Sequence, residues 1–261
     1  MKTFLKDTLF RLLSLVAPRI ADRASILMYH SVGDRADYFN NVSPRAFERQ
    51  MAYLAHSGRR VISFAELVRR LDRRETLDGA IVITFDDGYE DNYVNAFPVL
   101  KSYGFPATIF VATDLIGDAD KRGIQRLSPA QLREMHASGL IAIEPHTKSH
   151  PKLSQLDERA TREEIQGSMM AIEDLLGKKT TVFAYPYGNY NDMTVRIVQE
   201  SGMAAACTVE EGTVSAESDP YRLPRNSVDR STNMAQFRGK VSRVIDLYVR
   251  IKKFRRRANR F

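Results

Sequence analysis

The chain is predicted to be an α/β protein in which parallel strands alternate with helices. Short apolar runs recur along the sequence, and polar segments with helical periodicity separate them. Most of these runs are apolar at every position rather than at alternate positions, as in parallel strands that are buried on both faces. Repeated βα units build either a doubly wound sheet or a barrel, and the periodicity alone does not separate the two.

The expected elements follow in order from these runs and from the residues that punctuate them. The expected strands are residues 26–30, 60–63, 80–85, 107–112, 140–144, 180–185 and 204–208. The expected helices are residues 43–56, 64–71, 90–103, 128–138, 155–176, 191–201 and 232–251. The helix at 43–56 has a clear start, because serine is a favoured N-cap and the proline after it suits the first helical position.

Composition limits the kinds of protein that this chain can be. With 261 residues and 43% hydrophobic content, the chain can bury one large core, so a single large α/β domain fits its length better than two small domains. Cys207 is the only cysteine. An intramolecular disulfide is therefore excluded, and the chain is compatible with a reducing compartment.

The positive charge is concentrated at the C-terminal end. Between Arg238 and Arg260 there are ten basic residues and one acidic residue, which give this segment a net charge of +9. Because the whole chain has a net charge of +7, the rest of it carries −2. The segment is either a solvated tail or a contact for an anionic membrane surface. Nucleic-acid binding is not expected, because the most basic part, residues 250–261, has only Phe254 and Phe261 as aromatic residues and no nucleic-acid-binding module is present.

The N-terminal segment, residues 1–24, is expected to form an amphipathic helix. Arg11 interrupts its apolar stretch and Pro18 follows the one small-residue cleavage position, Ala17, so a cleaved signal peptide is not expected. The stretch is also too short to span a bilayer. The helix either packs on its own domain or lies on a membrane surface. We therefore expect a cytoplasmic protein that can rest on the inner membrane face.

Four expected strands end in polar residues of catalytic types. These ends are His30, the pair Asp86–Asp87, the loop from His146 to His150, and Tyr187 with its neighbours. In barrels and open parallel sheets, functional groups gather where strands end at their carboxyl side. We therefore expect these side chains to converge.

Two histidines and one carboxylate are a common ligand set for a catalytic divalent metal. His146 and His150 supply two imidazoles from one short loop, and an aspartate from a neighbouring strand end completes the set. Adjacent strand residues point to opposite sides, so Asp86 and Asp87 need not share one role. One can bind the metal while the other accepts a proton, and the cation offsets their mutual repulsion.

The sequences TFDDGY, HTKSHP and FAYPYG resemble the first three motifs of the NodB-homology polysaccharide deacetylases, carbohydrate esterase family 4, over about residues 25–230. The segments ILMYHSV, ISFAEL and RLPR resemble the poly-N-acetylglucosamine deacetylase branch, in which the motif order is permuted. The resemblance implies a distorted (β/α) barrel and removal of an N-acetyl group from an amino sugar. It also implies that Asp86 is the base, that Asp87, His146 and His150 bind the metal, and that the backbone N–H of Tyr187 serves the oxyanion hole.

The sequence departs from the family pattern at two places. Ala184 stands where the third motif usually begins with arginine, and no histidine follows His150 to act as the general acid. Arg222 or Arg225 is expected to replace the arginine, and both are expected to contact the substrate. His30 is expected to be the general acid, because the permuted order would bring this strand-end histidine to the place of the missing one.

The sequence therefore predicts a metal-dependent de-N-acetylase that acts on a polysaccharide, an oligosaccharide or a lipid-linked glycan. Zinc is the expected ion, with Ni²⁺, Co²⁺, Fe²⁺ and Mn²⁺ as alternatives. Tyr89 and Tyr187 are expected to stack on sugar rings, unless they serve only in packing. The rivals are a deformylase of a lipid-linked amino sugar and a catalytically silent domain that binds carbohydrate or scaffolds an assembly. Three segments are expected: residues 1–24, a catalytic domain at 25–230 and a basic extension at 231–261.

Overall fold

The computed structural model describes residues 22–35 and 37–258. The amphipathic helix expected in residues 1–24 therefore lies, as far as residue 21, outside the described residues. In the described residues, no helix is both long enough and apolar enough to cross a membrane.

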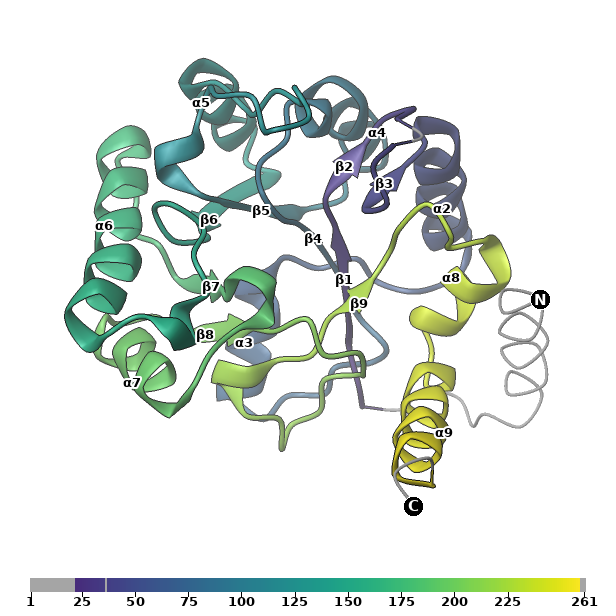
Figure 1. Ribbon diagram of the computed structural model, residues 1–261. Coiled ribbons are helices and arrows are strands. Elements are labelled where there is room, and N and C mark those ends of the chain that lie inside the picture. The colour runs from purple at the N-terminus through teal and green to yellow at the C-terminus, as the bar shows by residue number, and fades with distance from the viewer. Residues whose placement is uncertain (1–21, 36, 259–261) are drawn as a thin grey trace.

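A five-stranded parallel sheet forms the centre of the protein (Figure 1). Its order is β6-β5-β4-β1-β9. The bounds are β1 (Ser25–Tyr29), β4 (Ile81–Phe85), β5 (Ala107–Val111), β6 (Ile141–Pro145) and β9 (Asn226–Ser227). The four longer strands are the apolar runs that the sequence predicts as strands. All strands point the same way, so their carboxyl ends meet at one edge.

Two further strands continue the sheet into a distorted barrel (Figure 1). Strands β7 (Val182–Ala184) and β8 (Ala205–Cys207) pair in parallel. On one side the barrel closes through the backbone, because Leu223 pairs with Cys207 and the chain then continues into β9 beside β1. On the other side, between β6 and β7, the described residues form no backbone ladder. This unpaired boundary is called the β6–β7 seam below.

Helices cover the outside of the barrel (Figure 1). They are α2 (Pro44–His56), α3 (Phe64–Asp72), α4 (Phe97–Tyr103), α5 (Pro129–Ala137), α6 (Glu158–Leu176), α7 (Asp192–Glu200), α8 (Met234–Lys240) and α9 (Val244–Ala258). Six of them begin at a side-chain N-cap, and these caps are Ser43, Ser63, Ser128, Asp157, Asn191 and Asn233. Such side chains satisfy backbone N–H groups that a helix start otherwise leaves unpaired, so the polar punctuation fixes where each helix begins.

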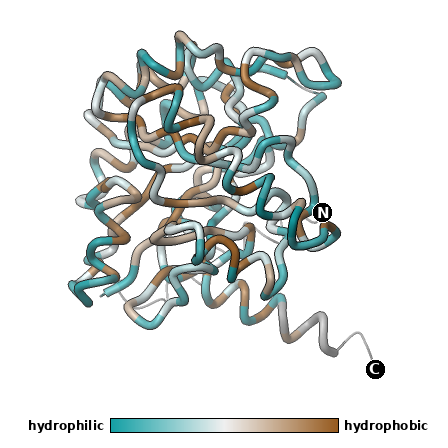
Figure 2. The backbone as a smooth tube through the Cα atoms, turned by 90° about the vertical axis from the view of Figure 1, so that its left-hand side faces the viewer, coloured by the Kyte–Doolittle hydropathy of each residue, from teal (hydrophilic) through white to brown (hydrophobic). Residues whose placement is uncertain are grey.

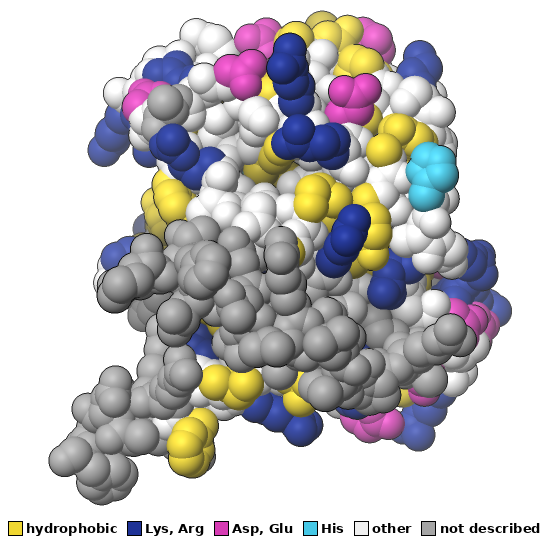
Figure 3. Space-filling view, turned by 90° about the vertical axis from the view of Figure 1, so that its right-hand side faces the viewer, with side chains coloured by type: hydrophobic (Ala, Val, Ile, Leu, Met, Phe, Trp, Pro, Cys, Tyr) yellow, Lys and Arg dark blue, Asp and Glu magenta, His cyan; other side chains and the backbone are white. Residues whose placement is uncertain are grey.

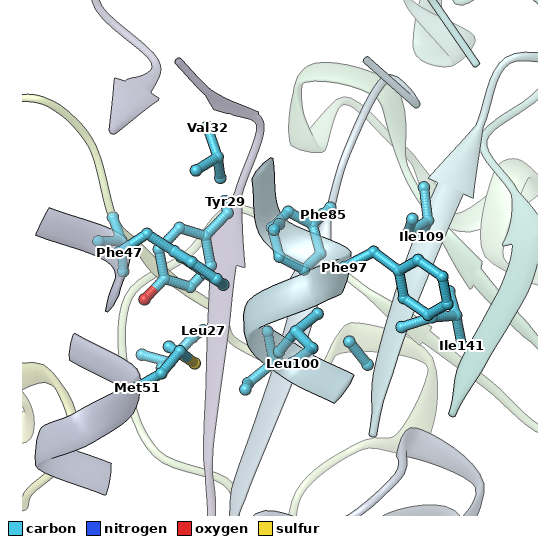
Figure 4. Close-up of a cluster of buried hydrophobic side chains, with 14 of the residues drawn as sticks. Leu27, Tyr29, Val32, Phe47, Met51, Phe85, Phe97, Leu100, Ile109 and Ile141 are labelled. Atoms are coloured by element: carbon cyan, nitrogen blue, oxygen red, sulfur yellow. The ribbon is translucent and has the colours of Figure 1, made fainter. Parts of the chain in front are cut away.

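The strands are buried on both faces. Toward the helices, Tyr29 and Phe85 stack with ring centroids 5.4 Å apart, and Phe47 of α2 meets Tyr29 edge-on (Figure 4). The buried Tyr29 hydroxyl donates to Gln50 at 2.9 Å, which satisfies its polar atom. Toward the barrel interior, alternate residues form a second cluster that includes Ile26, Val82, Phe110, Val182 and Cys207. In Figure 2 hydrophobic stretches accordingly follow the central strands, while the hydrophilic ones lie mainly at the periphery.

Several short elements were not predicted. They are the two-residue strands β2 (Ser31–Val32) and β3 (Asn41–Val42), and the 3₁₀ turns η2 (Thr113–Leu115), η3 (Leu153–Gln155), η4 (Pro186–Gly188) and η5 (Pro220–Arg222). The first half of the helix predicted at 90–103 is a π-helix, η1 (Asn92–Ala96), which passes into α4. π-Helical segments are often found at functional sites, and this one begins five residues after Asp87.

Two predictions of secondary structure were wrong. Residues 60–63 form no strand, because only Val61 makes an isolated bridge before Ser63 caps α3. The helix predicted at 232–251 is two helices. Its break lies at Ser242, whose hydroxyl donates to the carbonyl of Gly239 and accepts from the N–H of Val244. Local side-chain bonds of this kind compete with the helical ladder.

Candidate active site

A polar cavity of about 790 Å³ opens at the carboxyl ends of the strands. Its wall includes His30 after β1, Asp86 and Asp87 after β4, the loop that follows β6, and Tyr187 after β7. The structure thus brings together the strand ends that the sequence singles out.

Asp87, His146 and His150 place their donor atoms within 4.8 Å of one another. Oδ1 of Asp87 lies 3.2 Å from Nε2 of His150 and 3.8 Å from Nε2 of His146. The two Nε2 atoms are 3.2 Å apart. One carboxylate oxygen and two imidazole nitrogens therefore face a common point, and this donor set suits a divalent metal ion. In the described residues, this is the only group of three or more such side chains with metal-binding geometry.

The backbone of this group adopts unusual conformations. Asp87 and His150 have φ angles of 70° and 63°, in the left-handed region that residues other than glycine rarely occupy. Asp87 comes one residue after Asp86, and strand alternation alone would send it to the opposite side. The positive φ turns the chain at Asp87, so both aspartates reach the cavity. Backbone strain of this kind collects at functional sites.

His146 is fixed in one tautomer. Its Nδ1–H donates to the carbonyl of Ala184 at 2.7 Å, so a neutral ring presents the Nε2 lone pair to Asp87 and His150. The side chain is 2% exposed. Burial lowers the pKa of His146 to about 4, because it penalises the charged ring more than the nearby aspartates favour it. The ring is therefore neutral and ready to bind a metal at physiological pH.

The loop from His146 to His150 is held by a carboxylate from α6. Glu164 Oε2 accepts hydrogen bonds from the backbone N–H groups of Lys148 and Ser149, both at 2.9 Å. Its Oε1 accepts from the Ser149 hydroxyl at 2.6 Å. Glu164 could not be singled out from the sequence. It lies among several acidic residues of a predicted helix, and no local pattern shows which of them contacts the loop from His146 to His150.

Asp86 is paired with Arg225 inside the barrel. The two guanidinium Nη atoms lie 2.6 and 2.7 Å from its two carboxylate oxygens, and the Arg225 Nε–H donates to the carbonyl of Thr208. Both residues are buried, Arg225 completely. Burial by itself would raise the pKa of Asp86, but the charge and hydrogen bonds of Arg225, together with smaller contributions from the nearby histidines, outweigh this and hold the pKa below its ordinary value. Asp86 is therefore an ionised carboxylate.

The structure distinguishes the two arginines expected near the site. Arg225 holds Asp86 from inside the barrel, and it is not among the described residues that line the cavity. Arg222 lies on the surface, where it forms ion pairs with Asp192 and Asp219. Arg222 is not among the described residues that line the cavity, so the geometry does not support its predicted contact with substrate.

His30 lines the same cavity as the aspartates and the two histidines. Asn92, at the start of η1, donates from Nδ2 to the carbonyl of His30 at 2.7 Å. The neighbouring Asp91 accepts from the N–H of Val32 at 3.0 Å and from the Ser31 hydroxyl at 2.5 Å. Asp91 and Asn92, at the start of η1, therefore hold the His30 carbonyl and the two residues that follow it.

The two tyrosines expected to stack on sugar rings lie in different environments. Tyr187 is 60% exposed, has a φ of 58°, and its ring meets that of His150 with centroids 4.5 Å apart. Tyr89 is 1% exposed, and the Arg126 guanidinium lies 5.4 Å from its ring centroid. Only Tyr187 therefore presents a free aromatic surface. Arg126, which the sequence analysis missed, also donates from Nε to the carbonyl of Asp87 at 3.1 Å.

Comparison with known proteins decides the family. The sequence model of the family described as "Polysaccharide deacetylase" matches residues 73–206, slightly more than half of the chain. This chain belongs to the polysaccharide deacetylase family. The matched segment contains the aspartate pair and both histidines of the site. As a member of this family, the protein is a hydrolase acting on amide C–N bonds, and the family predicted from its motifs is confirmed.

Relatives of this polysaccharide deacetylase include proteins of known name and structure. The poly-beta-1,6-N-acetyl-D-glucosamine N-deacetylase of Staphylococcus epidermidis is 31% identical over 193 residues, which are 71% of this chain and 67% of the relative. The deacetylase PplD of Streptococcus pyogenes superposes with a TM-score of 0.77 at 26% identity, over 86% of this chain and all of that one. IcaB of Ammonifex degensii superposes with a TM-score of 0.76 at 30% identity, over 84% and 96%. The predicted α/β barrel of the polysaccharide deacetylase type is thereby confirmed.

Proposed function

We propose that this polysaccharide deacetylase removes the N-acetyl group from an amino sugar in a glycan. The observation that carries the proposal is the different environment of the two adjacent aspartates. Asp87 faces two imidazole nitrogens, whereas Asp86 is paired with Arg225 and excluded from that group. One aspartate is thus placed to bind a metal and the other to exchange a proton. The named staphylococcal relative, which acts on poly-N-acetylglucosamine, supports the same substrate class.

Asp87, His146 and His150 are the residues that would hold a divalent metal, with zinc as our proposed ion. Such an ion would polarise the acetamide carbonyl and lower the pKa of a water molecule. The residues fit this group, because the Nδ1–H of His146 is bonded to Ala184 and its Nε2 stays free for the ion.

Proton transfer falls to two residues of this chain. Asp86 accepts the proton of the attacking water, and its lowered pKa keeps it ionised and ready to do so. His30, on the wall of the same cavity, donates a proton to the departing amine. The backbone N–H of Tyr187 would stabilise the oxyanion, and its exposed ring offers a face for the sugar.

The assay that tests this function measures the released acid. Zinc-loaded protein is incubated with N-acetylated oligosaccharides and with an N-formylated amino sugar, and acetate and formate are quantified. Acetate release from the oligosaccharides is the expected result. Formate without acetate would instead establish the deformylase, and no acid from any substrate would favour a silent binding domain. The intact set of Asp86, Asp87, His146 and His150 argues against that silent domain.

We also propose that the basic C-terminal segment holds the protein against an anionic membrane. Arg243 and Arg250 line a cavity of about 260 Å³ with Arg23. Figure 3 shows basic side chains over the side of the molecule that carries α8 and α9. Arg23 precedes β1, whereas His30 follows it, so this cavity lies at the opposite end of the strands from the active site. A protein bound through it would present its active site to glycans on the aqueous side.

We also propose that the chain divides into residues 1–24, a catalytic domain at 25–230 and a basic extension at 231–261. Phe237 and Val241, from α8 and its C-cap, are buried in the main core with the strands of the barrel. We therefore assign membrane contact to α9, whose Phe254 is 74% exposed, and not to α8.

A further inference from the structure

The β6–β7 seam is crossed by side chains where a backbone ladder would be expected. Glu144 and His146 stand two residues apart around the end of β6, so they point to the same face. Glu144 reaches the start of β7 and His146 reaches its end. The two side chains thus form successive links between neighbouring strands.

The carboxylate of Glu144 takes the place of backbone acceptors. Its Oε2 accepts from the N–H groups of Thr181 at 2.8 Å and Val182 at 3.2 Å. Its Oε1 accepts from the ammonium of Lys178 at 2.7 Å, and the Glu144 side chain is only 3% exposed. A buried carboxylate is costly unless it is both paired and hydrogen-bonded, and here it is both.

His146 depends on the same seam. Its Nδ1–H can reach the Ala184 carbonyl only if β7 lies close to β6, and Ala184 comes two residues after Val182. That bond selects the tautomer whose Nε2 faces Asp87 and His150. Without it, either nitrogen of a neutral ring can carry the proton.

We propose that Glu144 is a positioning residue for the metal site. By holding β7 against β6 it keeps Ala184 within reach of His146, which fixes the tautomer and the direction of the imidazole. The inference rests on the proposed metal-binding role of His146. The effect of Glu144 on the position of β7 and on the His146 tautomer, however, concerns the metal-free protein. Glu144 is not among the described residues that line the catalytic cavity, so it acts only through His146.

Glu144→Gln tests the inference sharply. The side chain keeps its shape, but one carboxylate oxygen becomes an NH₂ group that must face either the two backbone N–H groups or the Lys178 ammonium. The matched control is Glu173→Gln. Glu173 lies on α6. It accepts hydrogen bonds from the backbone N–H of Thr180, the residue before Thr181, at 3.2 Å and from the Thr180 hydroxyl at 3.3 Å. Glutamine keeps an oxygen that can accept both bonds, so the control removes a carboxylate charge beside the same segment without touching β6.

Three quantities are compared in wild type and variants. The metal-free protein is analysed for amide hydrogen exchange at Thr181 and Val182 and for the ring ¹⁵N shifts of His146, which report its tautomer. Zinc affinity is measured by competition with a chromophoric chelator. In Glu144→Gln we expect at least about tenfold faster exchange at both amides, a mixed tautomer, and about 10–100-fold weaker zinc binding. Deacetylation is expected to recover when zinc is saturating.

Other outcomes would overturn the inference. A wild-type tautomer and unchanged zinc affinity in Glu144→Gln would do so, and so would an equal loss in Glu173→Gln. Glu144→Asp, which keeps the charge but shortens the side chain, is expected to change all three quantities in the same direction and keeps the test decisive if the glutamine variant does not fold. The tautomer and exchange measurements stand even if wild type releases no acetate, so a failure of the proposed function is distinguishable.

Discussion

Asp86 and Arg225 stand 139 residues apart in the sequence and form a two-pronged ion pair inside the barrel, with oxygen–nitrogen distances of 2.6 and 2.7 Å. The pair joins the end of β4 to the segment that closes the barrel between β8 and β9. We propose that Arg225 takes the place of the arginine expected at the third motif, where Ala184 stands. A buried carboxylate that is ionised requires such a partner, so the pair links the fold of the chain to the chemistry that we propose for Asp86.

Arg225→Lys is predicted to lower activity and to move its pH dependence. Lysine cannot reproduce the two parallel hydrogen bonds of a guanidinium. Because Arg225 lowers the pKa of Asp86, its replacement raises that pKa, and the acidic limb of the kcat/KM profile shifts to higher pH. Arg222→Lys, on the surface, is the matched control and should leave the profile unchanged. An unshifted limb in the Arg225 variant would exclude Asp86 as the titrating base.

Asp86→Asn and Asp87→Asn are predicted to fail in different ways. Loss of a general base costs about 10²–10⁴-fold in kcat, and Asp86→Asn should do so with metal still bound. Asp87→Asn should lose metal, because it removes one of three ligands. Metal content after dialysis, measured beside acetate release, separates the two. Equal metal loss in both variants would merge the roles that we assign to them.

His30→Ala is predicted to lower kcat by about 10²-fold or more while metal is retained. The basic limb of the pH profile should disappear, because the general acid is gone. His56→Ala is the control, since this exposed ring at the end of α2 is bonded only to the carbonyl of Ala52 among the described residues. A near-normal kcat in His30→Ala would assign proton donation to another group.

The metal-free protein is predicted to lose stability as the pH falls from about 6.5 to about 4. Folding lowers the pKa of His146 to about 4, so between these values the unfolded chain binds a proton that the folded chain does not. The contribution of His146 to the free energy of unfolding is therefore full above pH 6.5 and is lost as the pH approaches 4. The loss is at most about 3 kcal/mol. Urea unfolding with chelator present measures it, with His146→Gln as the comparison. Identical pH dependence of the two proteins would contradict the lowered pKa.

Binding to anionic vesicles is predicted to depend on the basic cavity at the amino end of the barrel. Full-length protein should sediment with vesicles that contain phosphatidylglycerol and not with neutral ones. Replacing Arg243 and Arg250 by glutamine should weaken binding, at about 1 kcal/mol for each residue near the surface. Replacing Lys121 and Arg122, which lie at the catalytic cavity, should not. Equal binding to both vesicle types would leave the segment as a solvated tail.

What the sequence predicted well was local. Apolar runs such as 81–85 and 107–111 became strands, and serine or asparagine before a polar periodic segment became an N-cap. The proximity of His146 and His150 in the candidate metal site was also predictable, because both belong to one short motif that follows a strand.

What the sequence could not give was mostly long-range. The choice between Arg222 and Arg225 depends on how the chain returns to β1, which no local pattern encodes. Glu144 and Glu164 were missed for the same reason. The partners of Glu144 lie across the β6–β7 seam, and those of Glu164 lie in the loop from His146 to His150. The strands β2, β3 and β9 have two residues each and carry no periodicity. The burial of Tyr89 beside Arg126 also depends on a contact that no local pattern encodes.

One measurement tests the central claim most directly: an anomalous difference map from crystals of the zinc-loaded protein. The account predicts a single peak bonded to Asp87, His146 and His150 at about 2.0–2.2 Å, with Asp86 still paired to Arg225 and outside the coordination sphere. A peak bonded to Asp86, or no peak among these three residues, would contradict the separation of roles between the two adjacent aspartates.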